Sequence, residues 1–240
     1  MTCENFHKSL RSGTLHLTNP LEWANDGDTW EAAIVAGGVF VKNHDGSFRQ
    51  YTEQLKTYLK DWYAQSWSLT AECDAIWSRY TRGGKRAIRI STTVRKLLLA
   101  LFRDDQFYAT PFLDAVRYRS EPEIEHEKTR IRFPLESENT IRPLLTLKRQ
   151  AYSYESEVRL LVWDRDRENK TATGKSYDFP VKNGLSSFIE DIALDPDCPQ
   201  ECLETENAFI HEHGYCGTAK KSTLNDPSCS PAIITPDNLC

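Results

Sequence analysis

The stretch Glu157-Val158-Arg159-Leu160-Leu161-Val162-Trp163 decides the fold class of this chain. After its first residues the segment is continuously apolar, which is typical of a β-strand buried on both faces rather than one with a solvated side. We therefore expect residues 157–163 to form an interior strand of a sheet.

Shorter segments on both sides of this strand indicate how the sheet is completed. Alternating or β-prone residues predict strands at 15–18, 62–69, 86–91, 112–118 and 188–194. Apolar residues at helical spacing predict helices at 4–11, 48–59, 141–148 and 199–213, and in segments that follow residues 70 and 92. No linker or repeat divides the chain, so the sequence predicts a single α+β domain over residues 1–224, with a mixed, mostly antiparallel sheet covered by helices. Residues 225–240 lack periodicity and predict a loosely ordered tail.

Composition points to a soluble protein. The chain has 240 residues, of which 39% are hydrophobic and 27% charged, as in ordinary globular domains. It contains neither an apolar run of the ~20 residues that a membrane helix needs nor the pattern of a signal peptide. Its seven scattered cysteines predict free thiols in a reducing compartment. We expect a cytoplasmic protein with no membrane partner, and its oligomeric state is open.

One group of residues has the composition of a zinc site. Cys198, Cys202, His211, His213 and Cys216 lie close together in the sequence. However, the helix predicted for residues 199–213 would separate Cys202 from His213 by about 16 Å along its axis. We therefore predict that these residues hold no metal.

Charge is distributed unevenly along the chain. The net charge is −5, but residues 79–159 contain 17 Lys and Arg against 11 Asp and Glu, which leaves this middle part at +6 and the rest at −11. A basic middle can attract an anionic ligand, and it can equally be a solvated surface. Anionic ligands, if they bind, are expected near Arg79, Arg82, Lys85 and Arg86.

Familiar catalytic motifs such as a P-loop, GxGxxG, HExxH or GxSxG are absent, and three other groups of residues could carry chemistry. The first is the predicted strand end at Thr18 and Asn19 with the Trp-bearing loop that follows it to Glu31. It could form a ligand rim, or it could be an Asn-Pro turn whose tryptophans pack on the core.

The second group combines aromatic residues with a basic turn. Trp67, Trp77 and Tyr80 could stack a flat ring, and Arg86 with its neighbours could neutralise a phosphate. The alternative is a charged helix end, where the helix dipole favours Lys and Arg.

The third group is Glu155, Glu157 and Arg159, which alternate and would share one face of a strand. Two neighbouring carboxylates beside an arginine can differ in pKa and so divide acid and base roles. The alternative is an ordinary Glu–Arg pair at a strand end. If the protein is an enzyme, we expect Glu157 to be its most sensitive residue.

The chain resembles a bacterial family known only as domain of unknown function twenty-nine seventy-one. The resemblance rests on ordered blocks: residues 9–20, then Asn25, Asp26 and Glu31, then 66–68, 76–80, 86–88, 116–118, Lys148, 154–160 and 191–194. At a coarser level this layout resembles that of ADP-ribosyltransferases, which carry a late Glu-x-Glu strand.

The coarser resemblance implies an NAD-using enzyme of a toxin or defence type, with NAD as substrate rather than resident cofactor. Glu157 would hold the nicotinamide ribose with Glu155 beside it, Trp77 or Tyr80 would stack a ring, and Arg86 would hold phosphate. Two other functions stay open from the sequence. One is a non-catalytic module that binds a nucleotide or nucleic acid, and the other is a protein-interaction domain.

Overall fold

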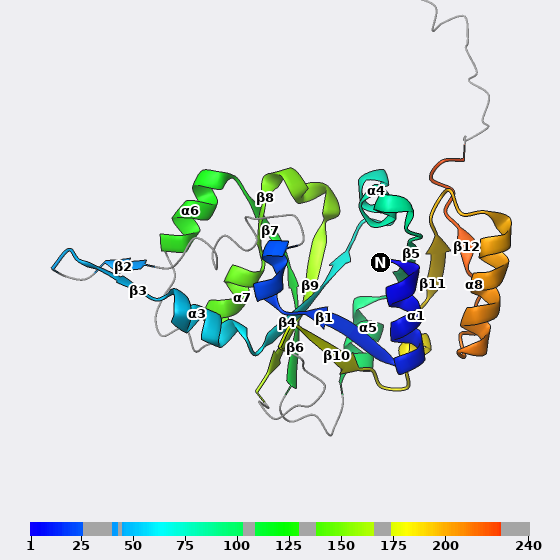
Figure 1. Cartoon of the computed structure of the whole chain (residues 1–240), viewed down its shortest axis with the longest axis horizontal. Coiled ribbons are helices and arrows are strands. Elements are labelled where there is room, and N and C mark those ends of the chain that lie inside the picture. Colours follow the sequence, from blue (N-terminus) through cyan, green and yellow to red (C-terminus); the bar gives the residue numbers. More distant parts are fainter. Residues whose placement is uncertain (26–39, 43–44, 103–108, 130–137, 166–173, 227–240) are drawn as a thin grey trace, which may run out of the picture.

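A five-stranded sheet lies at the centre of the computed structural model, which describes residues 1–25, 40–42, 45–102, 109–129, 138–165 and 174–226 (Figure 1). Its strand order is β10-β1-β4-β9-β6, and all neighbours are antiparallel. The strands are β1 (Thr14–Thr18), β4 (Trp62–Ser68), β6 (Ala109–Ala115), β9 (Glu157–Asp164) and β10 (Ser176–Pro180). Because β9 pairs on both edges and is almost entirely buried, the predicted interior strand is confirmed.

Smaller sheets add to this frame. β5 (Ile88–Ser91), β11 (Asp191–Leu194) and β12 (Lys220–Lys221) form a three-stranded sheet in the order β12-β11-β5, with β12 parallel to β11. β2 (Phe40–Lys42) and β3 (Phe48–Gln50) form an antiparallel hairpin, and β7 (Arg117–Arg119) pairs in parallel with β8 (Leu147–Arg149). The predicted α+β class with a mostly antiparallel sheet is therefore confirmed.

Helices cover both faces of β9, because successive strand residues point to opposite sides. Leu160 and Val162 belong to a core that contains residues of α1, α5 and α8, and Leu161 belongs to a second core with α3, α6 and α7. The helices are α1 (Cys3–Ser12), α3 (Thr52–Leu59), α4 (Asp74–Thr81), α5 (Val94–Leu101), α6 (Glu121–Thr129), α7 (Glu138–Leu145) and α8 (Gln200–Glu212). Short 3₁₀ turns lie at η1 (Pro20–Asn25), η2 (Arg82–Gly84), η3 (Gln150–Glu155) and η4 (Leu185–Ser187).

Several predicted boundaries were wrong because long-range pairing overrides local pattern. Residues 48–50 pair with residues 40–42 instead of starting α3. The predicted strand 112–118 divides in two, because after Ala115 the chain leaves β9 and pairs with β8. That same pairing makes residues 147–149 a strand rather than the end of a helix. Residues 188–190 precede β11 instead of beginning it.

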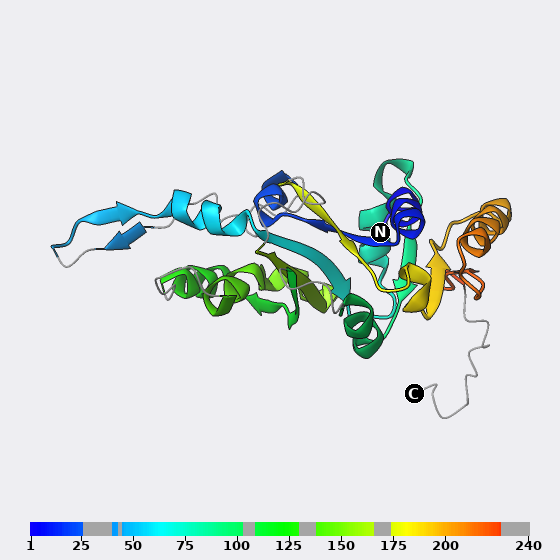
Figure 2. The same ribbon diagram turned by 90° about the horizontal axis from the view of Figure 1, so that it is seen from below.

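Elements far apart in the sequence lie side by side: α1 lies near α8, where His7 Nε2 is 2.7 Å from Glu206 Oε2 (Figure 1). Figures 1 and 2 both show the β2–β3 hairpin extending from one end, with α8 at the opposite end. None of the helices in the described ranges combines the length and apolar character that a bilayer crossing requires. The cysteines within these ranges, Cys3, Cys73, Cys198, Cys202 and Cys216, are free thiols. Residues 227–240, and with them most of the predicted tail, lie outside the described part of the chain.

Candidate functional site

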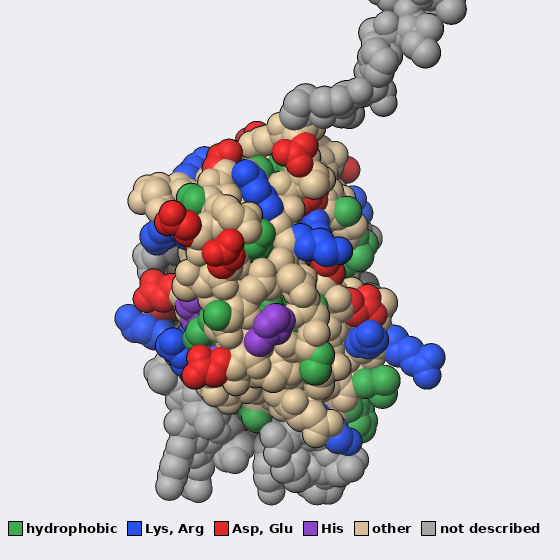
Figure 3. Space-filling model, turned by 90° about the vertical axis from the view of Figure 1, so that its right-hand side faces the viewer, with side chains coloured by type: hydrophobic (Ala, Val, Ile, Leu, Met, Phe, Trp, Pro, Cys, Tyr) green, Lys and Arg blue, Asp and Glu red, His purple; other side chains and the backbone are tan. Residues whose placement is uncertain are grey.

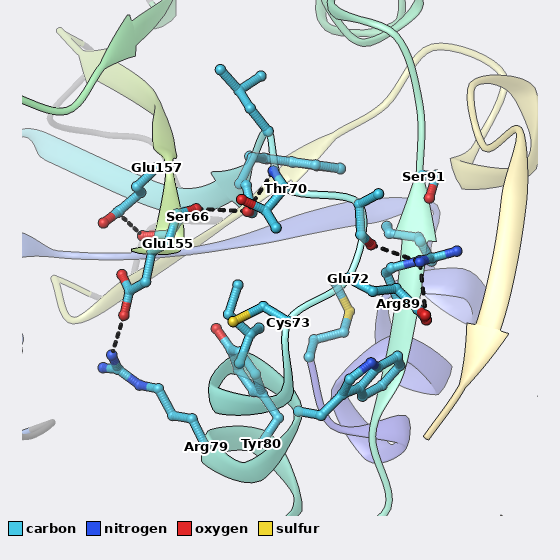
Figure 4. Close-up of a pocket in the computed structure, with 18 of the residues that line it drawn as sticks. Ser66, Thr70, Glu72, Cys73, Arg79, Tyr80, Arg89, Ser91, Glu155 and Glu157 are labelled. Atoms are coloured by element: carbon cyan, nitrogen blue, oxygen red, sulfur yellow. Dashed lines mark hydrogen bonds and ion pairs between the residues drawn. The ribbon is translucent and has the colours of Figure 1, made fainter. Parts of the chain in front are cut away.

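A cavity of about 440 Å³ lies where the end of β4, the helix α4 and the strand β5 meet. Figure 4 shows Arg79 reaching from α4 to Glu155 on one side and Arg89 beside Glu72 on the other, with Cys73 and Tyr80 between them. The volume falls within the ~300–1,000 Å³ that is usual for small-molecule sites. Its polar and aromatic lining includes Gln65, Ser66, Trp67, Glu72, Cys73, Trp77, Arg79, Tyr80, Arg89, Lys148, Glu155 and Glu157.

Local structure explains how these side chains come together. Beyond Trp67 the strand β4 ends, and the chain turns through residues 69–73 into α4, which begins after Cys73. Trp77 and Tyr80, three residues apart, therefore lie on the same side of a short helix. Trp77 is buried, whereas Tyr80 is 37% exposed and directs its hydroxyl group into the cavity (Figure 4).

The charged wall of the cavity is centred on Glu157. Arg159 Nε lies 2.7 Å from Glu157 Oε1, and Lys148 Nζ lies 2.8 Å from Oε2. Ser66 Oγ also donates to Oε1, and the backbone N–H of Glu157 donates to the hydroxyl of Tyr118 at 2.7 Å. Glu157 is only 3% exposed, so its carboxylate is fixed in one position by these contacts.

Glu157 is ionised despite its burial. Burial is the largest influence and would raise the pKa of the carboxyl group, because it disfavours the charged form. The charges and hydrogen bonds of Arg159 and Lys148 together outweigh it and lower the pKa of Glu157 to about 2. The wall therefore carries a full negative charge that two cations contact directly.

Glu155 links the buried cluster to the surface. Its Oε2 accepts from Lys148 Nζ at 2.6 Å, and its Oε1 accepts from Arg79 Nη1 at 3.0 Å. With Arg159, three cations thus face two carboxylates along this wall. Burial is the largest influence on the pKa of Tyr80 and raises it, and the nearby Arg79, which lowers it, does not outweigh burial. The hydroxyl group of Tyr80 therefore stays protonated at neutral pH.

The opposite end of the cavity is organised by Arg89 of β5. Its Nη1 donates to the Ala71 carbonyl at 2.6 Å and lies 3.2 Å from Glu72, while Nη2 donates to Asp191 at 3.0 Å. Three polar atoms of cavity-lining residues are buried without a hydrogen-bond partner among the described residues, namely Gln65 Oε1, Trp67 Nε1 and Arg89 Nε. Buried polar atoms are normally satisfied, so water or a ligand is expected to bond to them.

The cavity unites seven of the residues that the sequence singled out: Trp67, Trp77, Arg79, Tyr80, Lys148, Glu155 and Glu157. The others lie outside its lining. Arg159 lies behind Glu157, where it donates to the Leu145 carbonyl at 2.6 Å and covers the ring of Trp23. Arg86 is exposed, with a guanidinium nitrogen 3.7 Å from Cys198 Sγ.

Thr18 and Asn19 lie at the far end of β1 from the cavity-lining part of β4, since Thr18 pairs with Ala64. Asn19 is fully buried, and its amide nitrogen donates to the carbonyls of Leu59, Lys60 and Trp62 at 3.0–3.1 Å. It therefore fixes the turn between α3 and β4. Asp26 to Glu31 of the predicted rim lie outside the described residues.

Two features of the site differ from the sequence expectation. Glu155 was expected on the same strand face as Glu157, which is wrong, because Glu155 ends η3 and β9 begins only at Glu157. Arg89 and Glu72 were not anticipated at all. The pattern of residues 86–91 predicts a strand but does not indicate that the segment between β4 and α4 lies against Arg89.

The cysteines and histidines with the composition of a zinc site lie in and around α8. α8 ends at Glu212, and His213 caps it, so the helix expected between Cys202 and His213 is present. The absence of metal from this group stays a prediction. Comparisons of the chain with family models, with curated proteins and with solved structures found no match.

Proposed function

We propose that this cavity binds a small ligand of the nucleotide class, which combines a flat ring with an anionic group. One observation carries the proposal: a single 440 Å³ cavity is lined both by aromatic side chains and by Arg79, Arg89 and Lys148. Aromatic faces stack a ring at about 1–3 kcal/mol each, and arginine and lysine suit phosphate oxygens.

Several features favour a small ligand over a nucleic-acid strand. The three cations that line the cavity, Arg79, Lys148 and Arg89, each lie against a carboxylate. On the face that carries α8, lysine and arginine side chains are interspersed with acidic ones among the residues drawn (Figure 3). A strand of nucleic acid is instead bound by a continuous basic track.

The test is the affinity for ADP, measured by calorimetry, of the native chain, of Tyr80→Ala and of Tyr154→Ala. Tyr80 lines the cavity, whereas Tyr154 is a similarly exposed tyrosine, 41% accessible, outside the lining. Loss of one stacking face should weaken ADP binding about 10- to 100-fold in Tyr80→Ala alone. Absence of ADP binding, or equal loss in the two variants, would refute the proposal.

A second candidate is an NAD-using, ADP-ribosyltransferase-like activity. It is favoured by the two carboxylates on the cavity wall and by the low pKa of Glu157, since an ionised carboxylate could stabilise positive charge that develops on a ribose. The contacts of Glu157 with Lys148 and Arg159 weigh against it, because they already compensate that charge. Nicotinamide release from NAD, compared between the native chain and Glu157→Gln per folded molecule, distinguishes this activity from binding alone.

A further inference from the structure

We propose that the Glu155 carboxylate occupies an anion subsite formed by Arg79 and Lys148, and that a phosphate group of the ligand takes this place by displacing it. The inference rests on the proposed function and specifies where its anionic group binds. Glu155 therefore competes with the ligand for Arg79 and Lys148 and does not bind the ligand itself.

The geometry of the two cations defines the subsite. Arg79 Nη1 and Lys148 Nζ approach different oxygens of the same carboxylate, at 3.0 and 2.6 Å. A phosphate group also presents several acceptor oxygens, and charge-assisted bonds to arginine and lysine are its usual contacts in proteins. Arg79 and Lys148 both line the cavity, so an anion in this position would lie inside the ligand site.

The two neighbouring carboxylates differ in how firmly they are fixed. Glu157 has 2% of its side chain exposed and is bound by Arg159, Lys148 and Ser66. Glu155 has 12% of its side chain exposed and lies at the end of the 3₁₀ turn η3 rather than in a strand. Its backbone carbonyl accepts from Ser68 Oγ at 2.6 Å, so the chain stays anchored while the side chain rotates.

Displacement also leaves the charges balanced. When Glu155 rotates out, Arg79 and Lys148 both lose a contact with a carboxylate, and a dianionic phosphate in the same place restores the lost negative charge. Because Arg79 is 39% exposed, the released Glu155 can reach solvent on the same side. A ligand without an anionic group offers no such replacement.

The experiment measures the affinity of two probes, pyrophosphate and ADP, for the native chain, Glu155→Gln and Glu53→Gln. Gln keeps the shape of Glu155 but not its charge, so both probes should bind Glu155→Gln about tenfold more tightly than the native chain. Glu53 is the matched control, because it pairs with Lys56 on the surface of α3 and its neutralisation changes the net charge equally. Its affinities should equal those of the native chain.

Each pattern of results has a distinct meaning. Weaker or unchanged binding by Glu155→Gln, with binding by the native chain intact, would overturn the subsite and leave the proposed function standing. Equal gains in Glu155→Gln and Glu53→Gln would also overturn it, because they would reflect net charge alone. If neither probe binds any of the proteins, both the subsite and the proposed function fail.

Discussion

Arg159 and Glu157 lie two residues apart on the same face of β9, with Arg159 Nε 2.7 Å from Glu157 Oε1 and only 2% of each side chain exposed. Buried charges are tolerated only when they are paired, so this contact is part of the core beneath the cavity. The pair joins the interior strand of the sheet directly to the candidate site.

Glu157→Gln should therefore destabilise the fold. It removes a direct counter-charge of the buried Arg159 and Lys148, although Lys148 keeps its contact with Glu155. Breaking such a buried pair typically costs about 3–5 kcal/mol. Urea unfolding measures the change. Glu53→Gln, which breaks the exposed pair with Lys56, should cost less than about 1 kcal/mol. Equal stability of the two variants would contradict the assignment.

Acid should weaken the fold through the same group. The pKa of Glu157 is lowered from 4.5 to about 2 in the folded chain, so its stabilising contribution is complete above pH 4.5 and is lost as pH falls toward 2. The shift corresponds to roughly 3 kcal/mol. Between pH 5 and 2 the native chain should lose more stability than Glu157→Gln, and parallel unfolding profiles would argue against this role.

Asn19→Ala should affect stability and spare ligand binding. The side chain donates to the buried carbonyls of Leu59 and Trp62 and to the carbonyl of Lys60, and loss of such a donor costs about 1–3 kcal/mol. Thermal melting checks the loss of stability, and ADP calorimetry below the melting range checks binding. A loss of ADP affinity without a loss of stability would instead show that Asn19 contributes to the ligand site.

Arg79→Ala and Arg86→Ala should differ in their effect on ADP binding, because only Arg79 lines the cavity. Arg79 lines the cavity, whereas Arg86, Arg82 and Lys85 lie outside its lining. Arg79→Ala should weaken ADP binding about tenfold and reduce its dependence on salt, because one screened contact is lost. Arg86→Ala should change neither. If Arg86→Ala weakened ADP binding and Arg79→Ala did not, the ligand would bind near Arg82, Lys85 and Arg86 instead.

The sequence predicted those features that depend on local pattern. The apolar run from Val158 to Trp163 was sufficient to predict an interior strand, and aromatic residues of segments 66–68 and 76–80 both reach the cavity. Features that depend on distant pairing were missed. Glu155 leaves the strand because Ser156 adopts a left-handed conformation with φ 42°, which alternation of residue types does not encode. Arg89 joins the site because the segment between β4 and α4 places Ala71 and Glu72 against it.

A crystal structure of the chain with ADP would show whether the space between β4, α4 and β5 is the ligand site. We expect the base beside Tyr80 and the diphosphate on Arg79 and Lys148, with the Glu155 side chain turned away. ADP bound over Arg82, Lys85 and Arg86, with the cavity unchanged and Glu155 still paired to both cations, would contradict it.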